Sequence, residues 1–321
     1  MSNAVPDTAP NRPLDAVPGT GPSTGPDAEA RLVTRFGSEV RGWLAALPEL
    51  VGRLAVRWDL EVTEAVPHGS TSRTFRVRRA DGSAAFLKLT PEPEICAAEA
   101  LALRVWTSSP HVVRLIDADE RAGALLLEAV EPGTRVNELA VPPSPEQVSA
   151  LLRSLRVKEA PTELPPLRER VEFLFELTRR RLRSGPTTGG IDAAETGGLL
   201  RTAERLLDRS LPAALALTDG GPAGLVHGDL HPGNVLDGGA RGLVAIDPRP
   251  SVGDPAFDAV DWVLGGGAAH AEETAARLDL EDADRVTAWC RALAAVVAVP
   301  RLARGRHDDE TARLLELAGQ V

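Results

Sequence analysis

The sequence predicts an α+β protein in two unequal parts, a small antiparallel sheet followed by a mainly helical region. Three observations support this fold class. Short strand-like runs separated by turn residues fill most of residues 60–90. Apolar residues recur at helical spacing through most of the chain after residue 146. Between these regions, residues 131–145 lose the periodicity and gain prolines, as a linker does.

Composition limits the classes of protein this chain can be. With 321 residues and 43% hydrophobic residues, it can form two modest domains or one large one. The two cysteines lie far apart and form no CxxC motif, which favours a reducing, cytoplasmic setting. A formal charge of −10 argues against nucleic-acid binding and is compatible with a cationic ligand. Neither a secretory signal nor an uninterrupted apolar run of membrane-spanning length is present, so no membrane partner is expected.

The first part of the chain is expected to form a small lobe over residues 28–130. Residues 1–27 are rich in Pro, Gly, Ser and Thr and predict a disordered tail. Helical spacing follows from Ala28, with a break expected at Pro48. The remaining expected elements are strands at 60–66, 74–79 and 84–90, a helix at 94–108, and strands at 112–119 and 124–130.

The second part, residues 146–321, is expected to be mainly helical. Helical patterns cover residues 146–155, 167–183 and 195–211 and return after Asp261. The exception is a set of three short β-like runs, GLVH, NVL and GLVAI, with a hairpin turn at Asp237-Gly238-Gly239.

The first two of these runs flank the segment HGDLHPGN, which is rich in potentially catalytic side chains. His227, Asp229 and Asn234 lie in a loop turned by Pro232 and Gly233, and Asp247 ends the last run. A carboxylate can orient a hydroxyl group and accept its proton. An amide oxygen and a second carboxylate are hard ligands that suit Mg²⁺. The set therefore indicates phosphoryl transfer, although a solvent-exposed, Asx-rich turn is the alternative.

The segment HGDLHPGN and several others resemble those of a known family. HGDLHPGN followed by IDP is similar to the aminoglycoside phosphotransferases and, more widely, to kinases with an HRD-type loop and a DFG-type metal aspartate. RGWLAALPELVGRLAVRWDL, VVRLIDAD with ALLLEAVEPG, and AIDPRPSVGDPAFD resemble the streptomycin kinase branch, the aminoglycoside/hydroxyurea resistance kinases. The resemblance implies a two-lobed protein-kinase-like fold. Residues 28–130 would be the nucleotide-binding N-lobe, 131–145 the hinge, and 146–321 the C-lobe with the catalytic loop and substrate site.

The resemblance also implies roles for individual residues and a need for ATP and Mg²⁺. Asp229 would be the catalytic base or hydroxyl-orienting residue, and Asn234 and Asp247 would hold magnesium. Lys88 would point away from its flanking leucines into a cleft and pair with nucleotide phosphates. Glu99 on the following helix would hold Lys88 by an ion pair.

Two further segments match nucleotide-contacting positions of the family. PHGSTSRTF takes the place of the phosphate-covering loop, where Gly69 and Ser70 would meet the phosphates, although an ordinary hairpin turn remains open. Glu128 to Val130 match the hinge, where main-chain groups usually meet adenine.

Charge near the catalytic loop suggests the substrate. Six aspartates and two arginines lie between His227 and Asp261, which predicts a negative basin that would attract an amine or guanidine. Asp258 and Asp261 lie three residues apart on a presumed helix and are the candidates for contacting substrate amines. Asp254 precedes Pro255 and is expected to be an N-cap.

Together with these residues, the resemblance implies ATP-dependent phosphorylation of a hydroxyl on a small cationic antibiotic of the streptomycin type, which would confer resistance. The alternatives left open are hydroxyurea, a peptide antibiotic or a metabolite as substrate, or a nucleotide-binding regulator without turnover. A zinc hydrolase using His227, Asp229 and His231 is disfavoured because no further paired histidine motif is present. A protein kinase is disfavoured because only PRPSVG separates Asp247 from GDPAFD, which leaves no room for an activation segment.

Overall fold

The computed structural model describes residues 25–67, 71–157, 159–183, 193–280 and 282–321. Most of the tail expected over residues 1–27 therefore lies outside the described residues. Its last three residues belong to helix α1 (Gly25–Phe36), so this helix begins slightly earlier than the sequence indicated.

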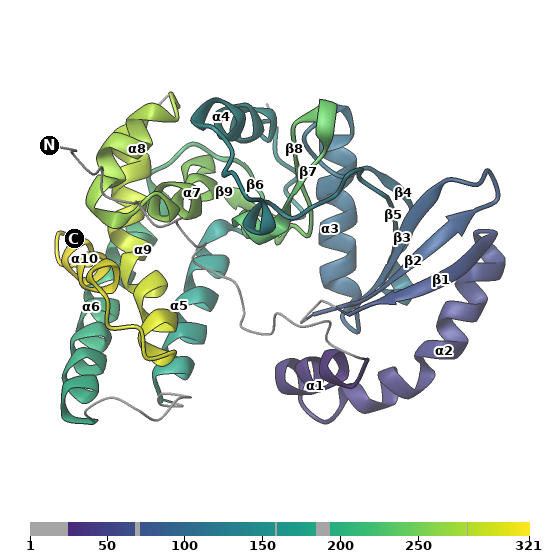
Figure 1. Ribbon diagram of the computed structural model, residues 1–321, viewed down its shortest axis with the longest axis horizontal. Coiled ribbons are helices and arrows are strands. Elements are labelled where there is room, and N and C mark those ends of the chain that lie inside the picture. Colours follow the sequence, from purple (N-terminus) through teal and green to yellow (C-terminus); the bar gives the residue numbers. More distant parts are fainter. Residues whose placement is uncertain (1–24, 68–70, 158, 184–192, 281) are drawn as a thin grey trace, which may run out of the picture.

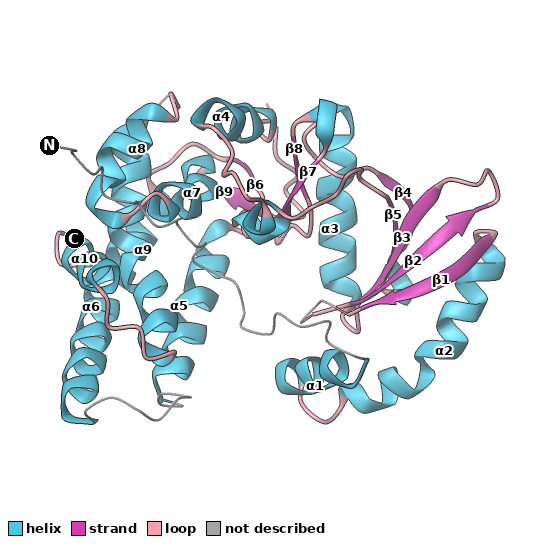
Figure 2. Cartoon of the chain, viewed as in Figure 1, coloured by secondary structure: helices cyan, strands magenta, loops and turns pink. Residues whose placement is uncertain are grey.

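The first lobe is built on one five-stranded antiparallel sheet, drawn at the right of Figures 1 and 2. Its strand order is β1-β2-β3-β5-β4. The strands are β1 (Leu60–Val66), β2 (Arg73–Arg79), β3 (Ala84–Leu89), β4 (Leu115–Asp119) and β5 (Ala124–Glu128). Alternation along β3 places Leu87 and Leu89 on one face and Lys88 on the other.

Helices lie on both sides of this sheet. α2 (Val40–Arg57) packs its buried Leu47 and Leu54 with Leu87 and Leu89. α3 (Pro93–Val105) lies on the side of Lys88 and stands between the sheet and the second lobe in Figure 1. The expected break at Pro48 is wrong, because α2 continues through this proline. The break occurs instead at Gly37, whose φ of 80° ends α1 in the left-handed region that glycine tolerates.

The chain passes from β5 to the second lobe through residues 129–144, whose one short helix is the 3₁₀ turn Val136–Glu138. α4 (Pro145–Ser154) then begins with a capping box. The Ser144 hydroxyl accepts the N–H of Gln147, and the Gln147 side chain accepts the N–H of Ser144.

Helices dominate the second lobe, at the left of Figure 1. They are α5 (Leu167–Arg183), α6 (Ala193–Asp219), α7 (Val260–Gly265), α8 (Ala271–Arg277), α9 (Ala283–Ala303) and α10 (Asp309–Ala318). α9 is long and apolar enough to cross a membrane, but 72% of its apolar window is buried inside the protein. It is therefore the central core helix of this lobe, packed against α5, α6, α8 and α10.

Two short antiparallel pairs form the face of this lobe that meets the sheet. β6 (Gly224–Val226) pairs with β9 (Ser251–Gly253), and β7 (Val235–Asp237) pairs with β8 (Leu243–Ala245). Three of these strands follow the sequence prediction, whereas β9 was not expected.

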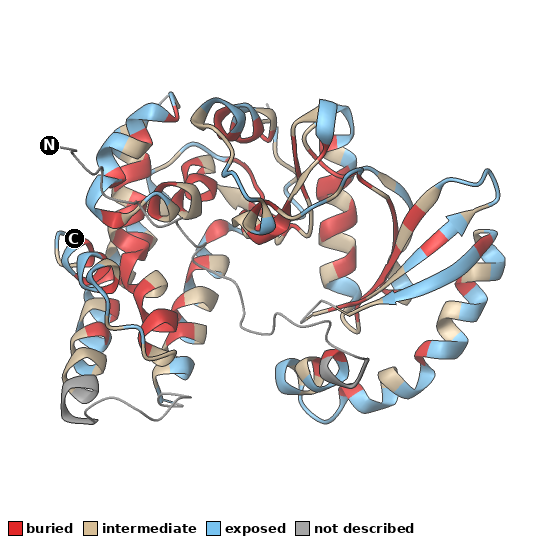
Figure 3. Ribbon diagram, in the orientation of Figure 1, coloured by how far each residue is buried: buried red, intermediate tan, exposed pale blue. Residues whose placement is uncertain are grey.

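Buried apolar residues form two clusters among the described residues. Figure 3 colours all buried residues red. The smaller cluster belongs to the sheet and α2. The larger runs from Leu125 and Leu127 of β5 through Leu103 of α3 to Phe175 of α5 and Trp289 of α9. One apolar core thus spans both lobes and fixes how the sheet faces the strand pairs β6–β9 and β7–β8.

Candidate active site

The loop His227–Asn234 joins β6 to β7, and a second segment, Ile246–Pro250, joins β8 to β9. Main-chain hydrogen bonds tie the two segments together. The Arg249 N–H donates to the His227 carbonyl (2.8 Å), and the Ile246 N–H donates to the Asn234 carbonyl (2.9 Å). Gly228 has a φ of 76° and lies so close to the Arg249 carbonyl that a Cβ would collide with it. The motif glycine therefore lets the segments carrying Asp229 and Asp247 approach each other.

Asp229 is held by groups on both of its carboxylate oxygens. Arg170 Nη2 donates to Oδ1 (2.9 Å), and Asn234 Nδ2 donates to Oδ2 (3.1 Å). Arg170 Nε also donates to the Gly228 carbonyl (2.8 Å). Burial lowers the pKa of Arg170, and the charge of Asp229 acts in the opposite direction. Sequence reasoning missed Arg170, which looks like any other polar residue of α5 and lies 59 residues from its partner.

Lys88 meets carboxylates from two distant parts of the chain. Its Nζ donates to both oxygens of Glu99 (2.7 and 2.6 Å) and to Oδ1 of Asp247 (2.6 Å). Burial opposes a charged lysine, but Asp247 and Glu99 outweigh it and raise the pKa of Lys88. Burial likewise opposes ionisation of Asp247, yet Lys88 and Arg249 hold its pKa well below its usual range. Burial raises the pKa of Glu99, and Lys88 acts in the opposite direction. The structure thus brings the sheet, α3 and the Ile246–Pro250 segment together at one lysine.

His227 lies underneath this cluster. Its side chain is fully buried, its Nε2 is 3.2 Å from the carbonyl oxygen of Ile246, and its ring stacks on Trp106 at 6.2 Å between centroids. Burial lowers its pKa to about 4, so the ring is neutral near pH 7. The histidine braces the residue that precedes Asp247.

Asp258, predicted to contact a substrate amine, has its carboxylate against the main chain of the His227–Gly228 segment. Its carboxylate accepts the main-chain N–H groups of His227 (2.7 Å) and Gly228 (2.9 Å), and burial raises its pKa to about 7. These bonds hold the His227–Asn234 loop in place. Asp258 also lines the pocket beside Asp229, so its contact with a substrate amine stays a prediction. The N-cap predicted at Asp254 is confirmed, because its Oδ1 accepts the Ala256 N–H (3.0 Å).

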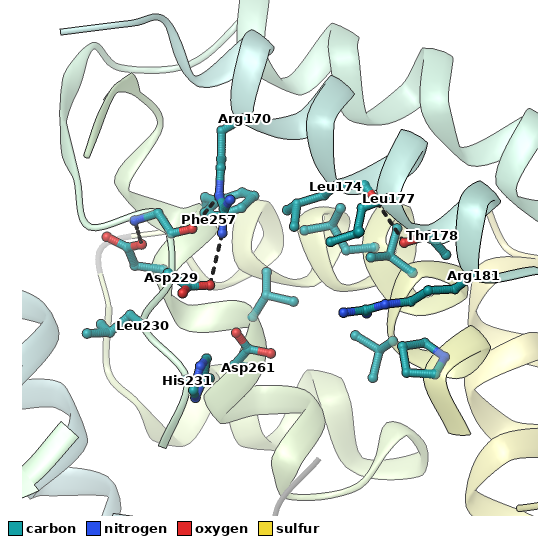
Figure 4. A pocket seen from close by; sticks show the side chains of 17 residues that line it. Arg170, Leu174, Leu177, Thr178, Arg181, Asp229, Leu230, His231, Phe257 and Asp261 are labelled. Atoms are coloured by element: carbon teal, nitrogen blue, oxygen red, sulfur yellow. Dashed lines mark hydrogen bonds and ion pairs between the residues drawn. The ribbon is translucent and has the colours of Figure 1, made fainter. Parts of the chain in front are cut away.

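A pocket with a cavity of about 110 Å³ opens beside Asp229 (Figure 4). Its walls come from α5, α9, the His227–Asn234 loop, and the 3₁₀ helix Pro255–Ala259 with α7. Asp229 and Asp261 contribute carboxylates, and Arg181 extends toward the same space in Figure 4. Much of the remaining wall is apolar, including Leu174 and Phe257.

The charges near the loop do not form the predicted negative basin. Asp229 is paired with Arg170 and Asp247 with Lys88, and Asp254 is paired with Arg285 and bonded to the Trp289 indole N–H. Asp258 is occupied by main-chain donors. The basin was wrong because a count along the sequence omits the cations that α5, α9 and β3 bring to these aspartates.

The structure describes only some of the other residues that were predicted to contact the nucleotide. Gly69 and Ser70 lie outside the described residues. The Glu128 carboxylate is bonded to Arg114 and Arg241, and its main-chain N–H donates to the Arg114 carbonyl (3.1 Å), so this N–H is used within the protein. Val130 is buried in the larger core.

Two groups at the site can serve as magnesium ligands. Asn234 uses its Nδ2 to bond Asp229, and no hydrogen bond among the described residues occupies its Oδ1. The Asp247 side chain keeps 36% of its surface exposed. An amide oxygen and an ionised carboxylate on adjoining segments are the hard donors that Mg²⁺ prefers, so the residues present fit this ion.

The fold has counterparts among solved structures. Choline kinase LicA from Streptococcus pneumoniae aligns with a TM-score of 0.56 at 13% identity, covering 86% of this chain and 99% of the other. The GDP complex of aminoglycoside 2'-phosphotransferase-IIIa aligns with a TM-score of 0.50 at 15% identity, covering 85% of this chain and 97% of the other. The fold class is therefore the protein-kinase-like fold, as the sequence predicted.

Sequence comparison narrows this class. The model of the aminoglycoside/hydroxyurea antibiotic resistance kinases matches residues 57–315, and the chain belongs to this family of small-molecule kinases. It is 35% identical over 263 residues to hydroxyurea phosphotransferase of Kitasatospora aureofaciens, covering 79% of this chain and 72% of that protein. It is 34% identical over 235 residues to streptomycin 6-kinase of Streptomyces griseus, covering 73% of this chain and 72% of that protein.

Proposed function

We propose that this protein transfers the terminal phosphate of ATP to a hydroxyl group of a small-molecule antibiotic and so confers resistance to it. The observation that carries the proposal is the convergence of Lys88, Asp229, Asn234 and Asp247 from three separate segments. Phosphoryl transfer depends mainly on positioning and charge neutralisation, and this cluster is suited to both.

Each residue has a distinct task in this proposal. Asp229, one third exposed and anchored by Arg170 and Asn234, orients the acceptor hydroxyl and accepts its proton. Lys88, held by Glu99, pairs with phosphate oxygens of the nucleotide. Asn234 and Asp247 hold Mg²⁺, which when bound neutralises charge on the phosphates. The Glu128–Val130 segment borders the adenine.

A streptomycin-type aminocyclitol is the first candidate substrate. Two relatives at 34% identity are streptomycin 6-kinases, and Asp261 on the pocket wall is the proposed contact for a substrate amine or guanidine. Because ATP is a cytoplasmic nucleotide and the apolar helix α9 is buried inside the protein, we place the reaction in the cytoplasm.

Hydroxyurea is the second candidate, and the pocket favours it in two respects. The cavity of about 110 Å³ suits a small acceptor, and its partly apolar wall and paired aspartates do not demand a highly cationic one. A relative at 35% identity is a hydroxyurea phosphotransferase.

The test is turnover with a short panel of acceptors. Purified protein with Mg²⁺-ATP is incubated with streptomycin, with hydroxyurea, or with urea, which lacks the hydroxyl group. We expect ADP release together with a product carrying one added phosphoryl group for streptomycin or hydroxyurea, and none for urea. If ATP binds but neither hydroxyl-bearing acceptor is phosphorylated, the proposed substrate class is wrong.

A further inference from the structure

Arg249 lies between the segment of Asp247 and the loop of Asp229, and none of the proposed residue roles involves it. It follows Asp247 by two residues, and its main-chain N–H and carbonyl are both packed on the His227–Gly228 segment. The position of Arg249 is therefore fixed from the side of Asp247 and from the side of the catalytic loop.

The Arg249 side chain reaches the opposite lobe. Its Nη2 donates to the hydroxyl of Thr71, in the connection between β1 and β2. Its Nη1 is buried and has no hydrogen-bond partner among the residues that the structure describes. A buried, unsatisfied donor on a cation is costly, so such groups are found where a ligand completes them.

The balance of charge around Arg249 points to an anionic ligand. Its charge acts on Lys88 and Asp247, and after burial it is the next cause that lowers the pKa of Arg35. Among the described residues Lys88 and Arg170 have carboxylate partners, whereas Arg249 forms no ion pair. No carboxylate in the described part of the chain therefore contacts Arg249 directly, which leaves its Nη1 available to an anionic ligand.

We propose that Arg249 binds the phosphate that is transferred, the terminal phosphate of ATP. This inference rests on the proposed function. The planar guanidinium offers several N–H donors that match phosphoryl oxygens better than an ammonium group does. Arg249 is attached to the segment of Asp247 and packs on the loop of Asp229, so it faces the place where the phosphoryl group leaves one oxygen and joins another. Lys88, on the sheet, remains for the other phosphates.

In the reaction the bond between the terminal phosphorus and the bridging oxygen breaks, and ADP keeps that electron pair. A bond forms between the phosphorus and the acceptor oxygen, whose proton passes to Asp229. Arg249 stabilises the charge on the non-bridging oxygens during this transfer, and the protein supplies this stabilisation from a side chain already in place.

Nucleotide binding tests the proposal without turnover. Dissociation constants for Mg²⁺-ADP and for the non-hydrolysable ATP analogue AMP-PNP are measured by calorimetry for the wild type, Arg249→Met and Arg53→Met. Arg53 is an exposed arginine on α2 and serves as the matched control. We expect Arg249→Met to weaken AMP-PNP binding by roughly 10-fold to 100-fold, the range for a charged hydrogen bond, and to change ADP binding less than about threefold. Arg53→Met should change neither.

The other outcomes are equally decisive. Equal weakening of both nucleotides, or no change in either, would overturn the assignment of Arg249 to the terminal phosphate. If Arg249→Met does not fold, Arg249→Lys replaces it and should lose AMP-PNP affinity selectively by a few-fold, because it keeps the charge but not the planar donors. A wild-type protein that binds neither nucleotide would overturn the proposed function itself.

Discussion

At the scale of single residues, the site is built from groups whose charge is set by burial and by one or two partners. His227 shows this most simply, because it is fully buried, contacts the Ile246 carbonyl and stacks on Trp106. Its neutral ring can bridge the loop and the Asp247 segment without placing another cation beside Lys88.

The lowered pKa of His227 predicts a stability effect with a definite sign. Folding lowers this pKa from 6.5 to about 4, so the unfolded chain takes up the proton first as the pH falls. The His227 contribution to stability is therefore present above pH 6.5 and is lost between pH 6.5 and 4. Asp258 acts in the opposite direction, because folding raises its pKa from 3.8 to about 7.

The His227 effect is isolated by comparing the wild type with His227→Gln. The free energy of unfolding is measured by urea titration from pH 7 to pH 4. We expect the stability advantage of the wild type to shrink by about 3 kcal/mol across this range, since one pKa unit corresponds to about 1.4 kcal/mol. A difference that stays constant with pH would show that His227 does not titrate in this way.

Membership of the site could be predicted for residues that lie in a local motif, but not for residues that only the tertiary fold brings to the site. Lys88, Asp229, Asn234 and Asp247 lie in motifs that the sequence displays, and the structure joins their side chains in two pairs, Lys88 with Asp247 and Asp229 with Asn234. Arg170 and Arg249 carried no motif signal of their own, because their importance depends on partners 59 and 178 residues away. The two hydrogen bonds of Asp258 could not be predicted, since they run to a segment 30 residues earlier.

At the scale of elements, the 3₁₀ helix Pro255–Ala259 shows how a local cap becomes a tertiary anchor. Asp254 caps this helix through the Ala256 N–H. The same carboxylate accepts hydrogen bonds from Arg285 and from the Trp289 indole N–H (2.6 Å), both on α9. It therefore fastens the segment carrying Asp258 to the central helix of the lobe.

Removing this carboxylate should be costly. We expect Asp254→Ala to lower the free energy of unfolding by about 3–5 kcal/mol, because it leaves the mostly buried Arg285 without its partner. Glu49→Ala, which removes an exposed ion pair with Arg53 on α2, should cost less than about 1 kcal/mol. Urea denaturation of both variants checks this, and similar losses in the two would contradict the anchoring role of Asp254.

The observed bounds of an element agree with the predicted bounds where the local residue pattern determines the element. β1, with its alternating pattern, and α5, with its helical periodicity, have the bounds that the sequence indicated. Pro48 misled because tertiary packing of Leu47 and Leu54 holds α2 together across it. β9 could not be expected, since its three residues form a strand only by pairing with β6, which lies 27 residues earlier.

At the scale of the whole molecule, function depends on how the two lobes are held against each other. The larger apolar core crosses from β5 and α3 into the helices of the second lobe. Trp106 at this junction donates its indole N–H to the Leu155 carbonyl (2.8 Å) and stacks on His227. Such contacts between distant segments explain why the sequence could indicate two parts but not how they meet.

The central claim is that this junction positions Asp229 to accept the proton of a hydroxyl while a nucleotide is bound between the lobes. The most direct measurement is the rate of transfer of labelled terminal phosphate from ATP to the accepted antibiotic, for the wild type and for Asp229→Asn, with both saturated with Mg²⁺-ATP. We predict that Asp229→Asn lowers this rate by roughly 10²-fold to 10⁴-fold while its affinity for Mg²⁺-ATP stays within about threefold. Transfer by Asp229→Asn at the wild-type rate would contradict the account.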